Sequence, residues 1–307
     1  MPDRSKLTTE KRNPRTRDID RRSTLEIVDL INAEDALVAS AVRKERKRIA
    51  RAVELVAGSF RRGGRLFYVG AGTSGRLGVL DASECPPTFG VSPSMVQGLI
   101  AGGRRALVRS SEGAEDHPEA GAAAVDRKHV SPRDTVVGIA ACGLTPYVRG
   151  ALARARHLGA STVFIVSAPQ AARGVPVDVV IRAVVGPEVV TGSTRMKAGT
   201  ATKLILNTLT TAAMIRIGKV FGNLMVDLRA RSVKLRDRAE RIIQSLTGIS
   251  RSRAGRLLKA ARGEAKTAIV MHTRGVGFVE ARNILKHCGG VLRKALAGPT
   301  PARARRP

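Results

Sequence analysis

Five short apolar runs, separated by glycine-rich turns and by longer helical patterns, constrain the fold more than any other feature of this sequence. The runs are Arg65–Val69, Met95–Ala101, Thr135–Ala141, Thr162–Ser167 and Val177–Val185. Strands that are apolar along their whole length are buried on both faces, and their alternation with helices is typical of a parallel sheet. We therefore predict an α/β fold built on a doubly wound parallel sheet, with ligands beyond the carboxyl ends of the strands.

Helical patterns on both sides of the strand region divide the chain. Apolar residues recur at helical spacing over 25–31 and 37–60, and again over 146–158 and 196–245. A run of short helical patterns then extends to Leu296. We predict a flexible N-terminus at 1–17, a sheet domain with flanking helices at 18–246, a small helical domain at 247–296 and a disordered basic tail at 297–307.

The chain is strongly basic, with 54 Lys and Arg against 25 Asp and Glu and a formal net charge of +29. Such an excess is typical of nucleic-acid or anionic-surface binding. Here it falls largely on helix exteriors such as Arg43–Arg48 and on the tail, with few aromatic residues to stack on bases and no zinc-finger spacing. We therefore expect solvated faces whose positive potential helps an anionic substrate approach, and no nucleic-acid partner.

The cysteines and the hydropathy pattern indicate a cytoplasmic protein. Cys85, Cys142 and Cys288 are far apart and odd in number. They form neither a metal spacing nor a disulfide framework, so we expect a reducing compartment and no metal. No run of about 18 apolar residues exists, and the polar segment Met1–Arg17 is no secretory signal. We expect no contact with a membrane.

The turn after the first strand, Gly70–Gly78, has the composition of a phosphate-binding loop. Its glycines allow close backbone approach, and the helix that follows offers unpaired N–H donors to an anion. Gly72, Thr73 and Ser74 are the candidate contacts. The loop is neither a Walker loop nor a clean dinucleotide fingerprint, and a plain strand-to-helix turn explains it equally well.

Two further segments add hydroxyl groups. Thr145 precedes Pro146 after the third strand, where it is either an N-cap or a ligand contact. The segment 188–200 combines Ser193 and Thr194 with the cations Arg195 and Lys197 at the start of a helix. Capping by either hydroxyl is the alternative to substrate binding there.

Two carboxylates are candidates for acid/base chemistry. Glu84 directly precedes a Cys85-Pro86-Pro87 turn, a rigid and apolar setting that would desolvate it. Glu115 belongs to a second acidic cluster, 112–117. Two carboxylates in different environments suit acid/base work on one carbon skeleton, although solvated surface acids would produce the same pattern.

Together these segments resemble the N-acetylmuramic acid 6-phosphate etherases, and the resemblance covers Thr9 to Leu296. The related glucokinase regulatory protein shares the motifs. The segments that carry the resemblance are Gly70–Arg76, Asp81–Thr88, Gly113–Asp116, Val190–Thr200 and Gly218–Asp227. It implies a sugar isomerase (SIS) domain, a small C-terminal helical domain and a homodimer with its active site near the interface.

The resemblance also implies the reaction. N-acetylmuramic acid 6-phosphate and water would give N-acetylglucosamine 6-phosphate and D-lactate, without a metal or organic cofactor, in cell-wall sugar recycling. Glu115 would remove the C2 proton of the open-chain aldehyde. Glu84 would protonate the departing lactate oxygen and then activate water.

The sequence departs from the family pattern in two loops. Cys142 and Leu144 stand where the family has serine and arginine, and Ser167-Ala168 stands where it has Cys-Asn. Loss of a charged hydrogen bond would weaken substrate binding by about 1.5–3 kcal/mol. A sugar-phosphate sensor without catalysis on the same fold is therefore the main alternative. An aldose–ketose isomerase and a nucleic-acid-binding regulator rank below it.

Overall fold

A five-stranded parallel sheet lies at the centre of the computed structural model, which describes residues 7–168, 172, 174–230 and 232–297. Its strand order is β2-β1-β3-β4-β5. The strands are β1 (Leu66–Gly70), β2 (Val96–Ile100), β3 (Thr135–Ile139), β4 (Ser161–Val166) and β5 (Val179–Arg182). Each apolar run of the sequence forms one of them, which confirms the predicted α/β class.

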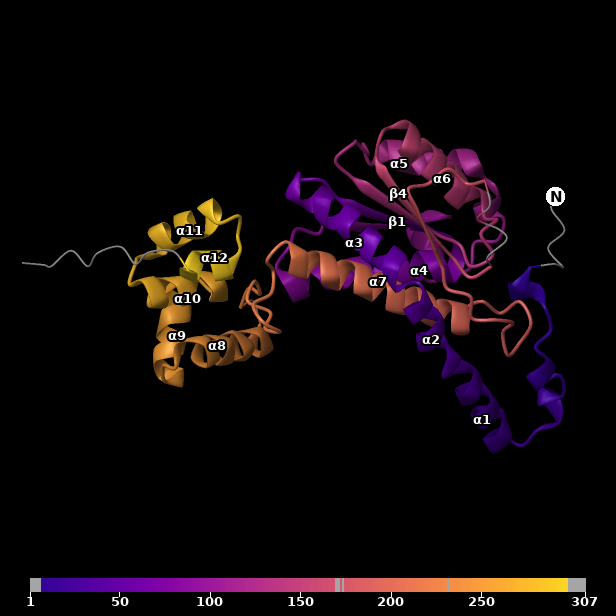
Figure 1. Cartoon of the computed structure of the whole chain (residues 1–307), viewed down its shortest axis with the longest axis horizontal. Coiled ribbons are helices and arrows are strands. Elements are labelled where there is room, and N and C mark those ends of the chain that lie inside the picture. The colour runs from indigo at the N-terminus through magenta and orange to yellow at the C-terminus, as the bar shows by residue number, and fades with distance from the viewer. Residues whose placement is uncertain (1–6, 169–171, 173, 231, 298–307) are drawn as a thin grey trace, which may run out of the picture. The chain divides into compact units, whose positions relative to one another are not determined.

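Helices cover both faces of the sheet (Figure 1). On one face, α5 (Pro118–Arg127) and α6 (Pro146–His157) pack on Phe67, Val136 and Phe164. On the other face lie α3 (Arg46–Arg61), α4 (Gly72–Phe89) and α7 (Lys197–Arg216). The α4 helix approaches so closely that a Cβ at Gly78 would lie 2.8 Å from Cβ of Tyr68. The chain before α3 forms α1 (Thr24–Asp35) and α2 (Leu37–Lys44).

Two carboxylates, the buried Asp134 and the exposed Asp178, hold the amino ends of the strands together. Asp134, 1% exposed, accepts hydrogen bonds from the backbone N–H groups of Arg65 and Ser131 at 2.7 and 2.9 Å. The Arg65 guanidinium binds the same carboxylate, with Nη2 at 2.9 Å from Oδ2. Asp178 accepts the Thr162 N–H at 2.7 Å between β4 and β5. The amino ends are thus tied down, and the loops at the carboxyl ends are left for a ligand.

Another buried carboxylate, Asp81, joins the sheet to two helices. It lies on α4 and accepts hydrogen bonds from the Tyr68 hydroxyl of β1 at 2.9 Å and from Nδ2 of Asn207 on α7 at 2.7 Å. The hydroxyl of Thr210, one turn later on α7, lies 3.2 Å from it. Because a buried charge is costly unless it is hydrogen-bonded, this arrangement fixes α4 against α7.

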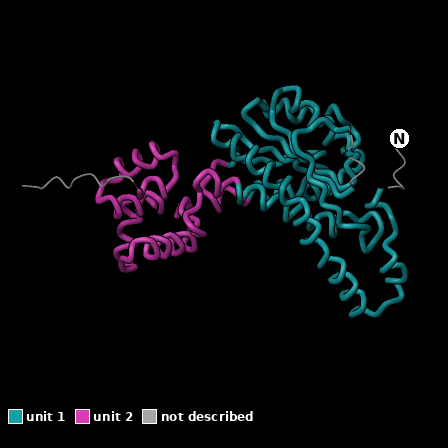
Figure 2. The backbone as a smooth tube through the Cα atoms, in the orientation of Figure 1, with its two compact units in different colours: residues 1–83, 93–212 teal, residues 84–92, 213–307 magenta. Residues whose placement is uncertain are grey.

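The chain divides into two compact units, residues 1–83 and 93–212 and residues 84–92 and 213–307 (Figure 2). The helices of the second unit are α8 (Val233–Thr247), α9 (Arg251–Ala260), α10 (Ala265–Arg274), α11 (Phe278–His287) and α12 (Leu292–Ala297). The division falls earlier than the boundary at 247 expected from the sequence. The reason is that α8 buries Ala239, Ile242 and Ile243 in the same apolar core as α9 and α10.

The N-terminal segment differs from the sequence prediction of a flexible end. Residues 7–17 contain the 3₁₀ turns Thr8–Glu10 and Pro14–Thr16, and several of their side chains are buried. Asn13 donates to the Pro187 carbonyl at 3.4 Å, and the Thr16 hydroxyl donates to the Val189 carbonyl at 2.9 Å. Residues 1–6 lie outside the described residues, and so does the predicted tail 297–307 except for Ala297, which ends a helix that begins at Leu292.

Within the described part of the chain, no helix combines the length and apolar character needed to cross a bilayer. Cys85, Cys142 and Cys288 form no disulfide in this part of the chain. The described residues contain no group of three or more His, Cys, Asp or Glu side chains arranged to hold a metal ion.

Replacing Asp134 by Asn is expected to lower the free energy of unfolding at pH 7 by about 2–3 kcal/mol, since the charged partner of Arg65 is lost. Burial raises the pKa of Asp134, but hydrogen bonds from Arg65 and Ser131 outweigh it and lower the pKa below its ordinary value. The ionised carboxylate therefore stabilises the fold above about pH 4, and this contribution is lost as pH falls through the lowered pKa.

Urea denaturation of parent and variant at pH 7 and pH 3 measures this difference. The difference in the free energy of unfolding between parent and variant should be smaller at pH 3 than at pH 7. Asp126→Asn is the control, because Asp126 forms an exposed ion pair with Arg154 that contributes less than about 1 kcal/mol. Equal effects of the two substitutions would contradict the role given to Asp134.

Candidate active site

A cavity of about 220 Å³ opens in the first unit, beside the carboxyl ends of β1 and β2. Ligands of doubly wound sheets occupy this region. Glu115 lies at the cavity, on the 3₁₀ turn Ala114–Asp116, and its side chain is exposed. The other lining residues are Ala71, Gly72, Arg76, Ala101, Ala106, Ser110, Ser111, Glu112 and Gly113. The cavity therefore joins one of the two predicted catalytic glutamates to the first predicted binding loop.

The turn from β1 into α4 is tight because it is built from glycines. A Cβ at Gly70 would lie 2.6 Å from N of Gly75, and one at Gly75 would lie 2.8 Å from O of Gly70. Gly72 has φ +49, which favours glycine. The turn places the first residues of α4, including Thr73 and Ser74, at the carboxyl edge of the sheet. The N–H groups that begin a helix have no partner within it and attract anions.

The third predicted segment, 188–200, forms a loop over 189–196 and then the start of α7. Glu188, for which the sequence suggested no role, closes this loop. Glu188 is 1% exposed, and its carboxylate accepts the backbone N–H groups of Lys197 and Ala198 at 3.0 and 2.9 Å. It therefore caps α7 in place of Ser193 or Thr194, the residues considered for that role from the sequence. The hydroxyls of this loop are not needed for capping.

The first and third loops meet. A Cβ at Gly199, on the first turn of α7, would lie 3.5 Å from the Thr194 carbonyl oxygen and 3.6 Å from Cγ2 of Thr73. The start of α7 thus lies beside the start of α4, at a distance where a Cβ on residue 199 would be in ordinary van der Waals contact with both. The structure brings together two hydroxyl-bearing segments that are 120 residues apart in the sequence.

Lys197 was predicted to contact the substrate, which would require its side chain to face solvent, but it is buried. Its side chain is 1% exposed, and Nζ forms a short ion pair with Glu34 on α1. Arg15 pairs with the other oxygen of Glu34 at 2.7 Å. Lys197 therefore braces the loop from inside. Arg195 is exposed on the same loop.

The second predicted loop presents an apolar surface. Cys142 and Leu144, which replace the serine and arginine of the resembling family, pack with Leu7 and Ala168 in a small cluster. Thr145 occupies the N-cap position of α6, but its side chain makes no capping hydrogen bond. Three of the four departures, Cys142, Leu144 and Ala168, thus lie in one place, where Leu7 of the N-terminal segment packs against them.

Glu84 is exposed, and it is not among the residues that line the cavity holding Glu115. The expected desolvation of Glu84 by its neighbours is therefore not seen in this single chain. The predicted turn at Cys85-Pro86-Pro87 is also wrong, since α4 continues through both prolines to Phe89. Each proline removes one backbone N–H donor from the helix and crowds the carbonyl four residues earlier, so the sequence favoured a turn at this point. Cys85 is 2% exposed, which agrees with its interpretation as a packed thiol.

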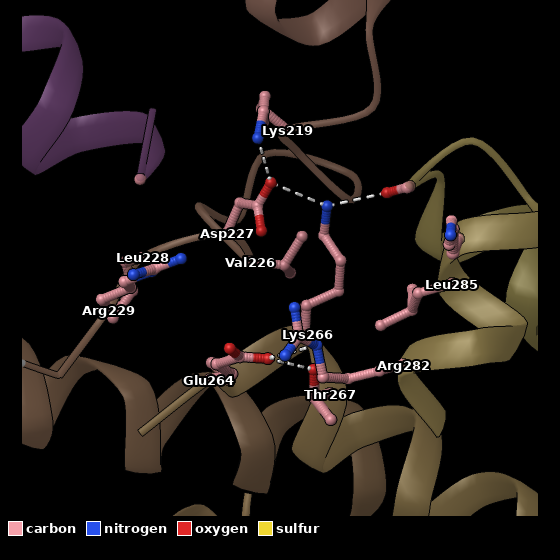
Figure 3. A pocket seen from close by; sticks show the side chains of 14 residues that line it. Lys219, Val226, Asp227, Leu228, Arg229, Glu264, Lys266, Thr267, Arg282 and Leu285 are labelled. Carbon is pink, nitrogen blue, oxygen red and sulfur yellow. Dashed lines mark hydrogen bonds and ion pairs between the residues drawn. The ribbon is translucent and has the colours of Figure 1, made fainter. Parts of the chain in front are cut away.

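A second cavity, of about 270 Å³, lies within the second unit (Figure 3). Lys266 lies at its wall and donates to the carbonyls of Gly218 and Gly290 at 3.1 and 2.8 Å. Its third partner is Asp227, at 3.0 Å, which also binds Lys219 at 2.7 Å. Burial lowers the pKa of Lys266, and Asp227 partly opposes this. All three ammonium protons are used, so Lys266 holds the segment 218–228 in place.

Whole-chain comparisons decide the family. The chain is 53% identical over 296 residues to the N-acetylmuramic acid 6-phosphate etherase of Gloeobacter violaceus, across 96% of this chain and 97% of the relative. It is 52% identical over 296 residues to the protein of the same name from Rhodopirellula baltica, across 96% and 98%. The chain belongs to the N-acetylmuramic acid 6-phosphate etherase family.

Two further comparisons match part of this etherase-family chain. A solved phosphoheptose isomerase from Neisseria gonorrhoeae aligns with 62% of the chain and 99% of its own length, at 15% identity and a TM-score of 0.47. The family model of the glucokinase regulatory protein N-terminal SIS domain matches residues 48–156. Both Glu84 and Glu115 fall within this matched range.

Several residues of the site were not predicted from the sequence. Arg76, Ser110, Ser111 and Glu112 line the cavity. Ser110 and Ser111 directly precede the acidic cluster, so their hydroxyls were a signal available in the sequence. Glu188 carried no such signal, because its role depends on a loop that folds back onto α7.

Glu188→Gln is expected to destabilise the etherase-family chain by about 1–2 kcal/mol, because an amide has one acceptor oxygen for two helix N–H groups. The loop 189–196 should also lose its fixed position, which should raise KM for a sugar phosphate. Urea denaturation and steady-state kinetics measure the two effects. Glu26→Gln, in the capping box of α1 with Ser23, is the matched control. A change in KM for the control but not for Glu188→Gln would contradict this role.

Proposed function

We propose that this protein cleaves N-acetylmuramic acid 6-phosphate to N-acetylglucosamine 6-phosphate and D-lactate. The observation that carries the proposal is the cavity in which Glu115 adjoins Gly72 and Arg76 of the first loop, in a chain of this family. Glu115 is a base beside a loop and a helix N-terminus suited to a sugar phosphate. The substrate class is a small sugar phosphate, and the biological role is recycling of cell-wall sugar.

The proposed reaction needs a base and an acid. In the open-chain aldehyde the C2 proton is acidified by the neighbouring carbonyl, and Glu115 removes it. The C3–O bond then breaks with its electron pair going to the lactate oxygen, which Glu84 protonates. Glu84 next removes a proton from water as the water oxygen adds to C3, and the proton on Glu115 returns to C2. Atoms balance without a metal or a cofactor.

The binding residues proposed for the sugar phosphate follow from the loops. Gly72, Thr73 and Ser74 offer backbone and hydroxyl donors at the start of α4. Ser193 and Thr194 belong to the loop that meets them near Gly199. Arg195, also on that loop, and Thr145, at the start of α6, complete the set, whereas Lys197 acts by bracing the loop.

Replacing either Glu84 or Glu115 by Gln is expected to lower kcat by about 100- to 10,000-fold, the usual contribution of one acid/base group. D-Lactate released from N-acetylmuramic acid 6-phosphate is the measured product. Glu119→Gln, an exposed residue of α5, should retain the parent rate. A folded parent that binds the sugar phosphate without releasing lactate would instead be a sensor, the alternative favoured by the apolar cluster at Leu144.

We propose further that the protein is a cytoplasmic homodimer. Free thiols support the compartment. The exposed face of α4 supports the dimer: Leu80 is 53% exposed, and Glu84 follows it one helical turn later. A second copy that covers this face would desolvate Glu84, which the single chain leaves in water. In a two-fold dimer each copy offers the same face to the other.

Mixing the two inactive variants tests this arrangement. If Glu84 of one copy completes the site that holds Glu115 of the other, a hybrid of Glu84→Gln and Glu115→Gln has one intact site. Random exchange of subunits should then restore about a quarter of the parent activity. Sedimentation should show a dimer at the concentrations assayed. A dimer without recovered activity would place both glutamates of a site on one chain.

A further inference from the structure

Arg76 is the cation of the Glu115 cavity, and its position is fixed at one end. It lies on the first turns of α4, half-buried, and its Nε donates to the carbonyl oxygen of Leu107 at 3.2 Å. This contact holds Arg76 against the 3₁₀ segment Gly103–Leu107, which follows β2. The guanidinium group therefore lines the cavity from a defined position.

The guanidinium has donors to spare. Arginine carries five N–H donors in a planar fork, and the contact with Leu107 uses one of them. Glu112 and Glu115 line the same cavity, yet among the described residues no carboxylate forms an ion pair with Arg76. The fork matches a carboxylate, which it can bind through two parallel hydrogen bonds. An anion of the ligand is the partner that this arrangement lacks.

The proposed substrate carries two anionic groups at different distances from the reacting carbon. The lactyl carboxylate is separated from C2 by the C3 ether and one further carbon. The phosphate lies at the other end of the open chain, beyond C4, C5 and C6. A base that reaches C2 therefore has the lactyl carboxylate close by. Arg76 shares its cavity with that base, and Thr73, Ser74 and the Ser193–Thr194 loop remain for the phosphate.

We propose that Arg76 is the specificity residue that binds the free carboxylate of the lactyl group, which rests on the etherase function proposed above. The ion pair between Arg76 and the lactyl carboxylate holds the C3 ether next to Glu115, and it forms only when that carboxylate is free. A substrate whose lactyl carboxyl is joined to an amine as an amide offers the fork no charge and is rejected. The reaction that supplies this substrate therefore has to release the carboxylate first, as hydrolysis of an amide does.

Three ligands separate the possible roles of Arg76. N-acetylmuramic acid 6-phosphate has both anions, its lactyl carboxamide has only the phosphate charge, and N-acetylglucosamine 6-phosphate lacks the lactyl group. Arg76→Gln should raise KM for the first by about 10- to 100-fold, the worth of a charged hydrogen bond. Its Ki for N-acetylglucosamine 6-phosphate should stay within about two-fold of the parent value. Parent selectivity against the carboxamide should disappear in the variant.

Two further variants complete the experiment. Arg76→Lys keeps the charge without the fork and should be intermediate. Arg104→Gln removes an exposed cation that does not line the cavity and should leave KM unchanged. An equal loss of affinity for all three ligands would overturn the proposal and assign Arg76 to the phosphate or to folding. An unchanged KM in Arg76→Gln would also overturn the proposal, because Arg76 would then have only a structural role through its contact with Leu107.

The test does not depend on turnover. Calorimetric titration of parent and Arg76→Gln with N-acetylmuramic acid 6-phosphate and N-acetylglucosamine 6-phosphate measures the same difference as affinities. If the parent releases no lactate but loses affinity selectively for the first ligand on substitution, the etherase function fails and the role of Arg76 stands. If the parent releases lactate and Arg76→Gln loses affinity equally for both ligands, the etherase function stands and the role proposed for Arg76 fails.

Discussion

The hydrogen bonds of Asp81 are the interaction on which the site depends. One buried carboxylate on α4 is held by Tyr68 of the sheet and by Asn207 and Thr210 of α7. A buried charge that loses such partners is strongly destabilising, so the two helices cannot shift without breaking several of these bonds. Helices transmit this constraint as rigid elements. The loops at the start of α4 and α7 are therefore fixed by a residue that lies away from both.

Local patterns in the sequence predicted the sheet but only part of the site. The five strands follow from apolar runs, because burial on both faces makes a strand apolar along its whole length, and such a run is recognised without knowledge of the fold. Gly72 and Glu115 were predicted for the same reason, since strand ends and glycine-rich turns are local features. Their shared cavity follows from the neighbouring positions of β1 and β2 in the sheet.

The remaining features arise from pairs of residues far apart in the chain. The sequence around Lys197 indicates a surface cation, whereas in the structure Lys197 is paired with Glu34, 163 residues earlier. Glu188 reads as one more acid, although it caps a helix that begins nine residues later. The cluster of Leu7 with Cys142 and Leu144 is of the same kind. No periodicity records such contacts, because each depends on how loops close over the edge of the sheet.

The contacts of the N-terminal segment have a consequence for biosynthesis. Thr16 finds its partner, the carbonyl of Val189, 173 residues later. Ribosomes add about 5–20 residues per second, so the segment waits roughly 10–35 seconds for that partner to be made. During this time the segment around Thr16 is available to chaperones and proteases. This segment is therefore sheltered only after 173 further residues have been made.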